Sequence, residues 1–152
     1  MLRNEKKNIT MKTITLYRPI GEKELILITE SNFTAFPPRL EWQPIFYPVL
    51  NEEYATEIAS KWNTIDSFGN YLGFVTEFKI TEEEFLKYKV ENVGGKIHNE
   101  LWVPSEKLED FNNSIIGEIK ITKVCIGDKY EKASTPLVQK QIERLENENE
   151  KL

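Results

Sequence analysis

Residues 45–62 read Ile-Phe-Tyr-Pro-Val-Leu-Asn-Glu-Glu-Tyr-Ala-Thr-Glu-Ile-Ala-Ser-Lys-Trp, a short apolar strand that runs directly into an amphipathic helix. Asn51 stands between the two, and asparagine is a favoured N-cap residue. One face of the helix would carry the apolar residues at helical spacing, which are Tyr54, Ala55, Ile58, Ala59 and Trp62. This step from strand to helix predicts a domain that packs strands and helices together.

Upstream of this stretch the pattern predicts one strand and one helix. Apolar and polar residues alternate over Lys12–Arg18, which indicates a strand that Pro19 would end. Glu22–Glu30 contains the run Leu-Ile-Leu-Ile and fits either a helix or a strand. The preceding glycine and the flanking glutamates favour a buried helix.

The segment Asn32–Pro44 contains three prolines among aromatic residues. Because proline lacks the backbone donor that strands and helices use, we expect an ordered loop here. Long loops of this kind often serve function. Arg39, Trp42 and Gln43 in this loop are candidates for covering a bound cofactor.

Downstream the chain is expected to be richer in strands. Alternation predicts strands over Tyr71–Ile80, Lys96–Val103 and Ile115–Ile126. Short helices are expected between them, at Phe85–Tyr88 and Pro104–Phe111. We therefore predict an α+β domain with about five or six strands and without repeated parallel βαβ units.

The composition fits one globular domain, with 152 residues of which 39% are hydrophobic and 30% charged. A net charge of −5 argues against broad binding to a phosphate backbone, although a local basic groove is compatible with it. Cys125 and His98 are the only cysteine and histidine, so we expect no metal site and no disulfide.

Because no apolar run indicates a signal peptide or a membrane span, we expect a cytoplasmic protein without a membrane partner. Residues 1–11 are interpreted as an extension.

Residues 131–152 form a charge-rich tail with helical periodicity. Its apolar residues and one asparagine follow alternating steps of four and three, at Val138, Ile142, Leu145, Asn149 and Leu152. Such a seam is typical of a short coiled coil, which would join two copies into a homodimer through residues 136–152. The alternative is a helix that docks on its own domain or frays in solvent, since two heptads are short.

Three short segments carry polar and aromatic side chains on the predicted strands and helix. They are Leu16-Tyr17-Arg18, then Ile45–Val49 with the following Tyr54-Ala55, and last Asn99–Val103. In this order they resemble the first, second and third motifs of the cholera- and pertussis-toxin-like ADP-ribosyltransferases. The resemblance extends from Leu16 to about Val124.

The chain also resembles small bacterial proteins labelled "ADP-ribosylation/crystallin J", through residues 36–39, 43–51 and 100–104. That label borrows the name of the ADP-ribosyl hydrolases, which are larger, helical and metal-dependent and which this strand-rich chain does not resemble. The resemblance to the transferases implies an ADP-ribosyltransferase-like fold over residues 12–130, in which two small, mostly antiparallel sheets form a cleft with short helices.

The same resemblance implies that the chain transfers ADP-ribose from NAD to an unidentified acceptor, either a protein or a nucleic acid. Glu100 would be the catalytic residue and Arg18 would hold NAD. Tyr47 and Tyr54 would enclose the nicotinamide ring, and His98 would contact the ribose or the acceptor.

Two departures from the family's motifs leave the acceptor open. Phe46-Tyr47-Pro48 stands where the toxin-like subgroup carries Ser-Thr-Ser. His98 stands two residues before Glu100, where the arginine-modifying members place a glutamate.

Glu100 has a physical case that is independent of the resemblance. Cleavage of the bond between nicotinamide and ribose builds positive charge on the sugar, which a fixed carboxylate would stabilise. In the alternative interpretation, Glu100 lies on the solvent face of a strand, Arg18 is a surface residue beside a turn, and the tyrosines belong to the core. The rival to the enzyme is a non-catalytic nucleotide- or protein-binding module that keeps the fold.

Overall fold

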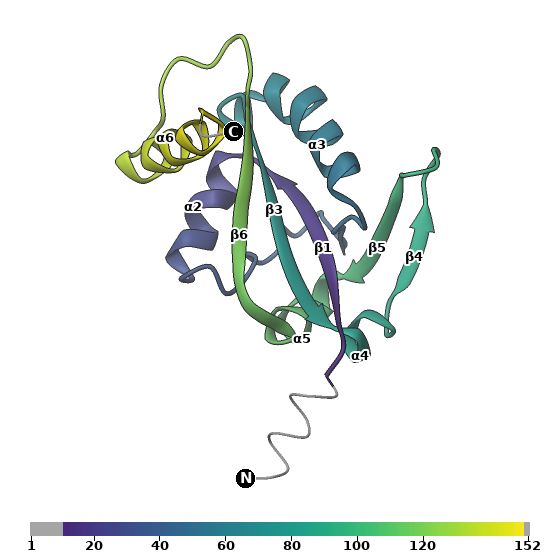
Figure 1. Cartoon of the computed structure of the whole chain (residues 1–152). Helices are drawn as coiled ribbons and strands as arrows, with labels where there is room; N and C mark the ends of the chain where they lie inside the picture. Colours follow the sequence, from purple (N-terminus) through teal and green to yellow (C-terminus); the bar gives the residue numbers. More distant parts are fainter. Residues whose placement is uncertain (1–10, 151–152) are drawn as a thin grey trace.

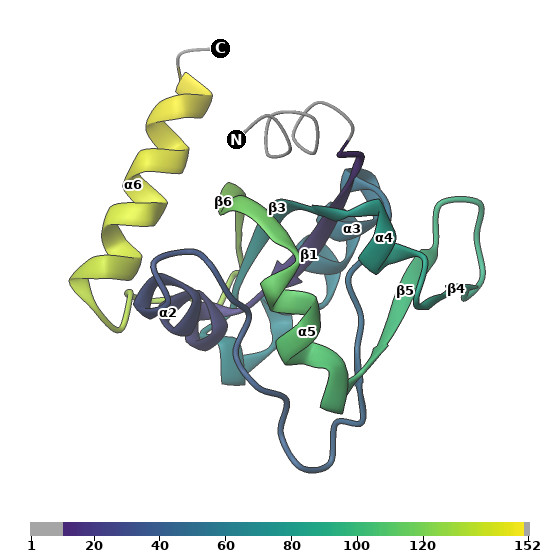
Figure 2. The ribbon, with the colours of Figure 1, turned by 90° about the horizontal axis from the view of Figure 1, so that it is seen from below.

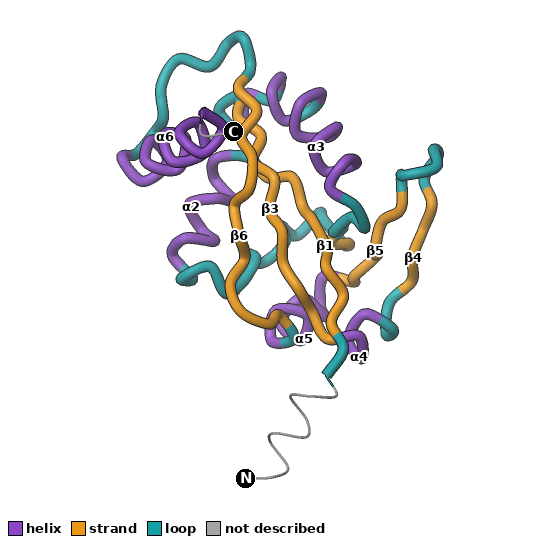
Figure 3. Tube along the Cα trace, viewed as in Figure 1, coloured by secondary structure: helices purple, strands orange, loops and turns teal. Residues whose placement is uncertain are grey.

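A computed structural model describes residues 11–150, which form two three-stranded antiparallel sheets (Figures 1 and 3). The first sheet has the order β1 (Thr13–Ile20), β3 (Leu72–Thr81), β6 (Ile115–Ile126). The second has the order β2 (Ile45–Phe46), β5 (Asn99–Pro104), β4 (Lys89–Asn92). The expected α+β class, with two small antiparallel sheets, is therefore confirmed.

Five α-helices and three one-turn helices complete the described part of the chain. The α-helices are α2 (Glu22–Glu30), α3 (Glu52–Lys61), α4 (Glu82–Phe85), α5 (Leu108–Asn113) and α6 (Pro136–Glu150). The one-turn helices are η1 (Asn63–Ile65), η2 (Ser67–Gly69) and η3 (Ser105–Lys107). Figure 1 shows α3 on one side of the first sheet and α2 with α6 on the other.

The central strand β3 is buried on both faces. Phe74 and Phe78 are buried in the larger core, which also receives apolar residues of α2, α5 and α6. Val75 points the opposite way, into a smaller core with Ala55 and Ala59 of α3. Because helices cover both faces of this strand, five successive residues from Leu72 to Thr76 are buried.

The proline-rich loop after α2 is ordered because Phe36 anchors it in the larger core. The ring of Phe36 lies 4.8 Å from that of Phe78 and 5.2 Å from that of Phe46. The side-chain amide of Asn112 bonds both the N–H and the C=O of Phe36, each at 3.0 Å. The expected loop is confirmed, and Figure 2 shows it projecting from the body of the domain.

Val49 connects the two sheets, because it pairs with a residue of each. Its N–H and C=O bond the backbone of Tyr17 on β1, at 2.7 and 2.9 Å, and it also bridges to Glu100 on β5. The segment around Val49 therefore runs between β1 and β5. Residues on these two strands, Arg18 and Glu100 among them, are brought to neighbouring positions.

Several element boundaries agree with the sequence-based expectation. The helix Glu22–Glu30 and the strand Ile115–Ile126 have the predicted bounds. Asn51 caps α3, since its Oδ1 accepts a hydrogen bond of 2.7 Å from the N–H of Tyr54. Trp62, expected on the buried face of this helix, is instead 64% exposed, because the regular helix ends at Lys61.

Other elements differ from the expectation, among them the strand expected at Ile45–Val49, of which β2 keeps Ile45–Phe46, and the helix expected at Phe85–Tyr88, which is α4 at Glu82–Phe85. β1 continues through Pro19 to Ile20, because β1 is an edge strand of its sheet and a proline there removes no essential ladder bond. β5 begins at Asn99 rather than Lys96, after a turn. The strand β4 was not predicted, since Lys89–Asn92 is short and mostly polar and gains its structure by pairing with β5.

The tail forms the expected helix, and its apolar seam docks on the same chain. Val138, Ile142 and Leu145 are 0%, 3% and 2% exposed and belong to the larger core. The guanidinium of Arg144 adds a hydrogen bond of 2.8 Å to the C=O of Ile121 on β6. These seam residues are therefore not available to a second copy, and a homodimer through this helix would have to use another face. Residues 1–10 and 151–152 lie outside the described residues.

Candidate functional site

The carboxylate of Glu100 is held in a fixed orientation by two donors. Alternation along β5 buries Leu101 and Val103 and turns Glu100 and Trp102 to the opposite face, as the pattern predicted. The hydroxyl of Tyr54 donates a hydrogen bond of 2.6 Å to Oε2, and the indole N–H of Trp102 donates one of 3.1 Å to Oε1. Each oxygen keeps capacity for a further donor, so the carboxylate can still bind a ligand hydroxyl.

Tyr54 is suited to remain a donor. Burial, and then the hydrogen bond to Glu100, raise the pKa of its phenol well above the ordinary value. Because Tyr54 lies in the first turn of α3, the Asn51 cap that starts this helix also sets the position of its side chain. The donor to Glu100 therefore comes from a rigid element.

Glu100 opens onto a pocket of about 380 Å³, which we call the Glu100 pocket. It is lined by Arg18, Pro19, Tyr47, Val49, Ile58, Asn63, Glu100 and Trp102. The rings of Tyr47 and Trp102 meet edge to face, with centroids 5.7 Å apart. A mostly apolar cavity of this size with a few convergent polar groups is typical of small-molecule sites.

Arg18 lines this pocket, and part of its guanidinium group is already paired with another side chain. Its guanidinium forms a two-point ion pair with Glu24, at 2.7 and 3.0 Å, and lies 4.6 Å from the centre of the Phe46 ring. The side chain is only 11% exposed. Nη1 makes no hydrogen bond to any described residue. The group is thus positioned, with donor capacity left for an anion.

A second pocket of about 470 Å³, here the proline-loop pocket, adjoins the first and shares Arg18, Pro19 and Asn63 with it. Its other walls come from α2, the proline-rich loop and the segment around η2, and they include Lys23, Glu24, Arg39, Gln43 and Phe68. Burial, and then the charge of Arg18, lower the pKa of Arg39. The two guanidinium groups therefore lie close enough to influence one another.

His98 lies behind the Glu100 pocket and does not line it. Its Nδ1 accepts a hydrogen bond of 2.9 Å from the N–H of Gly95, and its Nε2 is 3.4 Å from Oε2 of Glu57. Its ring packs against that of Tyr54, with centroids 4.7 Å apart. In this position His98 supports the turn before β5 and the ring of Tyr54, and its contact with a ribose or an acceptor stays a prediction.

Of the five residues predicted from the sequence, the structure brings three to the pocket wall. Arg18, Tyr47 and Glu100 line it, whereas Tyr54 reaches it through its hydrogen bond to Glu100. Three residues at these pockets were not predicted from the sequence, namely Trp102, Asn63 and Glu24. For Trp102 a signal existed, because it follows Glu100 by two residues on the same strand face.

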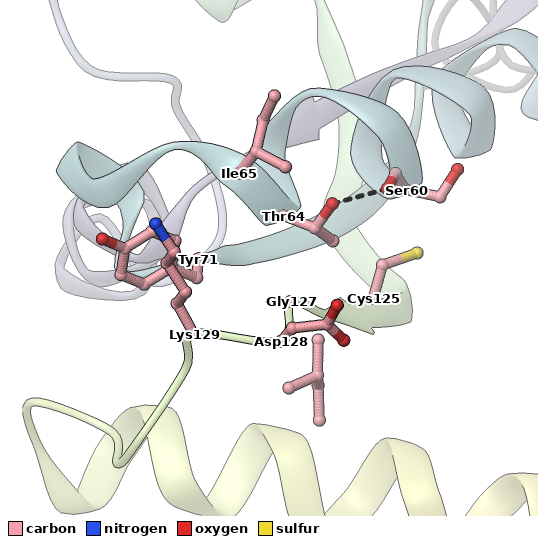
Figure 4. A pocket seen from close by; sticks show the side chains of 9 residues that line it. Ser60, Thr64, Ile65, Tyr71, Cys125, Gly127, Asp128 and Lys129 are labelled. Atoms are coloured by element: carbon pink, nitrogen blue, oxygen red, sulfur yellow. Dashed lines mark hydrogen bonds between the residues drawn. The ribbon is translucent and has the colours of Figure 1, made fainter.

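A third pocket, of about 440 Å³, lies beside Cys125 at the end of β6 (Figure 4). Ser60, Thr64, Tyr71, Asp128 and Lys129 are among its lining residues. Burial raises the pKa of the Cys125 thiol, which therefore stays protonated and weakly nucleophilic at neutral pH. This pocket lacks the oriented carboxylate found at Glu100.

Within the part of the chain that the structure describes, no group of three or more His, Cys, Asp and Glu residues is arranged to hold a metal ion. No helix of residues 11–150 has the length and apolar character needed to cross a bilayer. Comparison of the chain with known protein families, with curated proteins and with solved structures found no match.

Proposed function

We propose that the chain is an NAD-dependent ADP-ribosyltransferase with an ADP-ribosyltransferase-like fold, and that the Glu100 pocket is its active site. The observation that carries the proposal is the convergence on one pocket of Arg18, Tyr47 and an oriented Glu100 carboxylate, from three separate motif segments. The acceptor is a protein or a nucleic acid.

The reaction breaks the bond between the nicotinamide nitrogen and C1′ of the ribose. The bonding electrons leave with nicotinamide, which becomes neutral, and positive charge develops on the sugar. The Glu100 carboxylate stabilises that charge and accepts a hydrogen bond from a ribose hydroxyl. The acceptor then forms the new bond at C1′ and loses a proton.

The pockets fit the two halves of an elongated dinucleotide. The Glu100 pocket, with its aromatic walls, takes the nicotinamide and its ribose. The diphosphate lies near Arg18, where the two pockets meet, and the rest of the molecule follows the proline-loop pocket past Arg39. Both volumes lie within the range of about 300–1,000 Å³ that is usual for ligand sites.

A second candidate is a binding module that keeps this pocket without turnover. The observation that favours it is the ion pair of Arg18 with Glu24, which occupies part of the guanidinium that NAD would need. Such a module would bind a nucleotide or a protein at the same place.

Two measurements on the full chain separate these functions. Calorimetry with NAD tests binding, and a nicotinamide-release assay with and without cell extract tests turnover. Binding together with release supports the transferase, and labelled NAD then identifies the acceptor as protein or nucleic acid. Binding without release in any extract supports the module, and absence of NAD binding overturns the transferase.

A further inference from the structure

The side-chain oxygen of Asn63 is buried without a hydrogen-bond partner. Among the described side chains it is the only buried nitrogen or oxygen atom in this condition. Buried polar atoms in folded proteins are almost always paired, so the partner of this oxygen has to come from beyond the described residues, as a water or a ligand.

Close packing fixes Asn63 in this position. A Cβ atom placed on Gly73 of β3 would lie only 2.9 Å from Cβ of Asn63 and 2.5 Å from the C=O of Ala59. The absence of a side chain at Gly73 thus lets the end of α3 and the start of η1 press onto the sheet. The Cβ of Asn63 is thereby held against the sheet, so its amide can reorient only by rotation about the side-chain torsions.

Asn63 also lies where the two pockets meet, since it lines the Glu100 pocket and the proline-loop pocket alike. The amide oxygen is enclosed in this conformation, and because the terminal torsion of an asparagine has broad, shallow minima, rotation about it can present the oxygen to a ligand. Asn63 is therefore positioned to form hydrogen bonds with a polar group of a molecule bound beside Glu100.

We infer that Asn63 recognises the carboxamide of the nicotinamide ring and thereby selects NAD over its nicotinic acid counterpart. This inference rests on the proposed function. A primary carboxamide has two N–H donors and a C=O acceptor, and one N–H together with the C=O matches the C=O and one N–H of Asn63 in a two-bond pair. A carboxylate in its place would set an oxygen against the oxygen of Asn63 and leave that atom unpaired.

The assignment to the carboxamide follows from the division of roles in the pocket. Glu100 is an acceptor that suits the ribose hydroxyl, and Tyr47 and Trp102 offer apolar ring surface. Asn63 is the pocket residue that needs a donor and can give one in return. The carboxamide is the group on nicotinamide that supplies both.

The test compares calorimetric affinities of the full chain for NAD and for nicotinic acid adenine dinucleotide. We expect the parent chain to bind NAD about tenfold or more tightly, and Asn63→Ala to bring the two affinities within about twofold of each other. Without ligand, Asn63→Ala should keep the thermal midpoint, because alanine retains the Cβ that packs beside Gly73 and the amide oxygen has no hydrogen bond to lose.

Asn112→Ala is the matched control. The amide of Asn112 bonds both backbone groups of Phe36, so this variant should lower the thermal midpoint and keep the preference for NAD. If Asn63→Ala keeps the preference of the parent chain for NAD, the inference about Asn63 is wrong and the proposed function still stands. An equal loss of affinity for both dinucleotides assigns Asn63 to the shared ribose and also overturns it. If neither dinucleotide binds the parent chain, the proposed function fails as well.

Discussion

The hydroxyl of Tyr54 lies 2.6 Å from Oε2 of Glu100 and donates a hydrogen bond to it, which joins helix α3 to strand β5. The two residues are 46 positions apart, so the contact exists only in the folded chain. It orients the one carboxylate that faces the Glu100 pocket. In the proposed reaction Tyr54 is thus a positioning residue for Glu100.

Tyr54→Phe should lower nicotinamide release by about tenfold to a hundredfold while the KM for NAD changes little. A hydrogen bond to a charged group contributes about 1.5–3 kcal/mol, and here it would be lost from the orientation of Glu100. Steady-state kinetics check this split between kcat and KM. A rise in KM with kcat unchanged would place Tyr54 in substrate binding instead.

Glu100→Gln should reduce nicotinamide release by about a hundredfold to a thousandfold and leave NAD affinity nearly unchanged. The substitution keeps the size of the side chain and removes the charge that acts on the developing sugar cation. Glu57→Gln is the control, because Glu57 faces His98 outside the pocket and its removal should keep turnover. Parent-level release by Glu100→Gln would show that Glu100 does not catalyse the reaction.

Arg18→Ala should weaken NAD binding by about 1–3 kcal/mol and also destabilise the fold by a similar amount. The second effect arises because the substitution leaves the partly buried Glu24 without its cation and removes the contact with Phe46. Calorimetry and thermal unfolding measure the two effects. A surface residue beside a turn would change neither.

Glu24→Gln tests the same ion pair by replacing its acidic partner. Removing the carboxylate frees Arg18 for an anionic ligand, so affinity for NAD should rise, by about threefold to tenfold. Weaker binding in this variant would mean that Glu24 positions Arg18 for the ligand rather than competing with it. Glu30→Gln, at the other end of α2, should have no effect on affinity.

Local patterns predicted the main elements because those elements are determined by residues near one another in the chain. The N-cap at Asn51 and the alternation of Glu100 with Leu101 are examples, and both held. The strand β4 was missed because its stability comes from pairing with β5, which no property of Lys89–Asn92 reveals.

The candidate site was predictable only where side chains follow a local period. The shared strand face of Glu100 and Trp102 follows from alternation. Arg18 and Glu100 lie near each other because Val49 pairs with both β1 and β5. The periodicity of a sequence does not reveal such long-range pairing. No pattern in the sequence marked Asn63, because its position depends on the contact of its Cβ with Gly73 on a different element.

Ile142→Ala should lower the free energy of unfolding by about 2–5 kcal/mol, the usual range for opening a cavity at a fully buried site. Ile142 is 3% exposed in the core, and α6 is thus part of the domain. Urea unfolding measures the loss, with the exposed Glu146→Ala as control. If Ile142→Ala instead turned a dimer into a monomer at unchanged stability, as light scattering would show, the coiled-coil interpretation would be restored.

Glu84→Gln should destabilise the fold at neutral pH and lose this effect in acid. Glu84 is 6% exposed and accepts hydrogen bonds from Tyr88 and from Lys87. Burial by itself would raise the pKa of this carboxyl, but the hydrogen bonds from Tyr88 and Lys87 outweigh it and lower the pKa below the ordinary value. A folded-state pKa that is depressed adds stability above the unfolded-state value, and this stability is lost as the pH falls through the folded-state value.

The comparison is therefore urea unfolding of the parent chain and of Glu84→Gln at pH 7 and at about pH 3. We expect a difference of about 1–3 kcal/mol at neutral pH, because the amide of glutamine is a weaker acceptor for Tyr88 and carries no charge for Lys87. The difference should shrink in acid, where Glu84 of the parent chain takes up a proton. Glu83→Gln changes the same charge at an exposed neighbouring position and should differ little from the parent at either pH. An equal loss for Glu84→Gln at both pH values would show that size and shape, rather than the ionised carboxylate, make Glu84 stabilising.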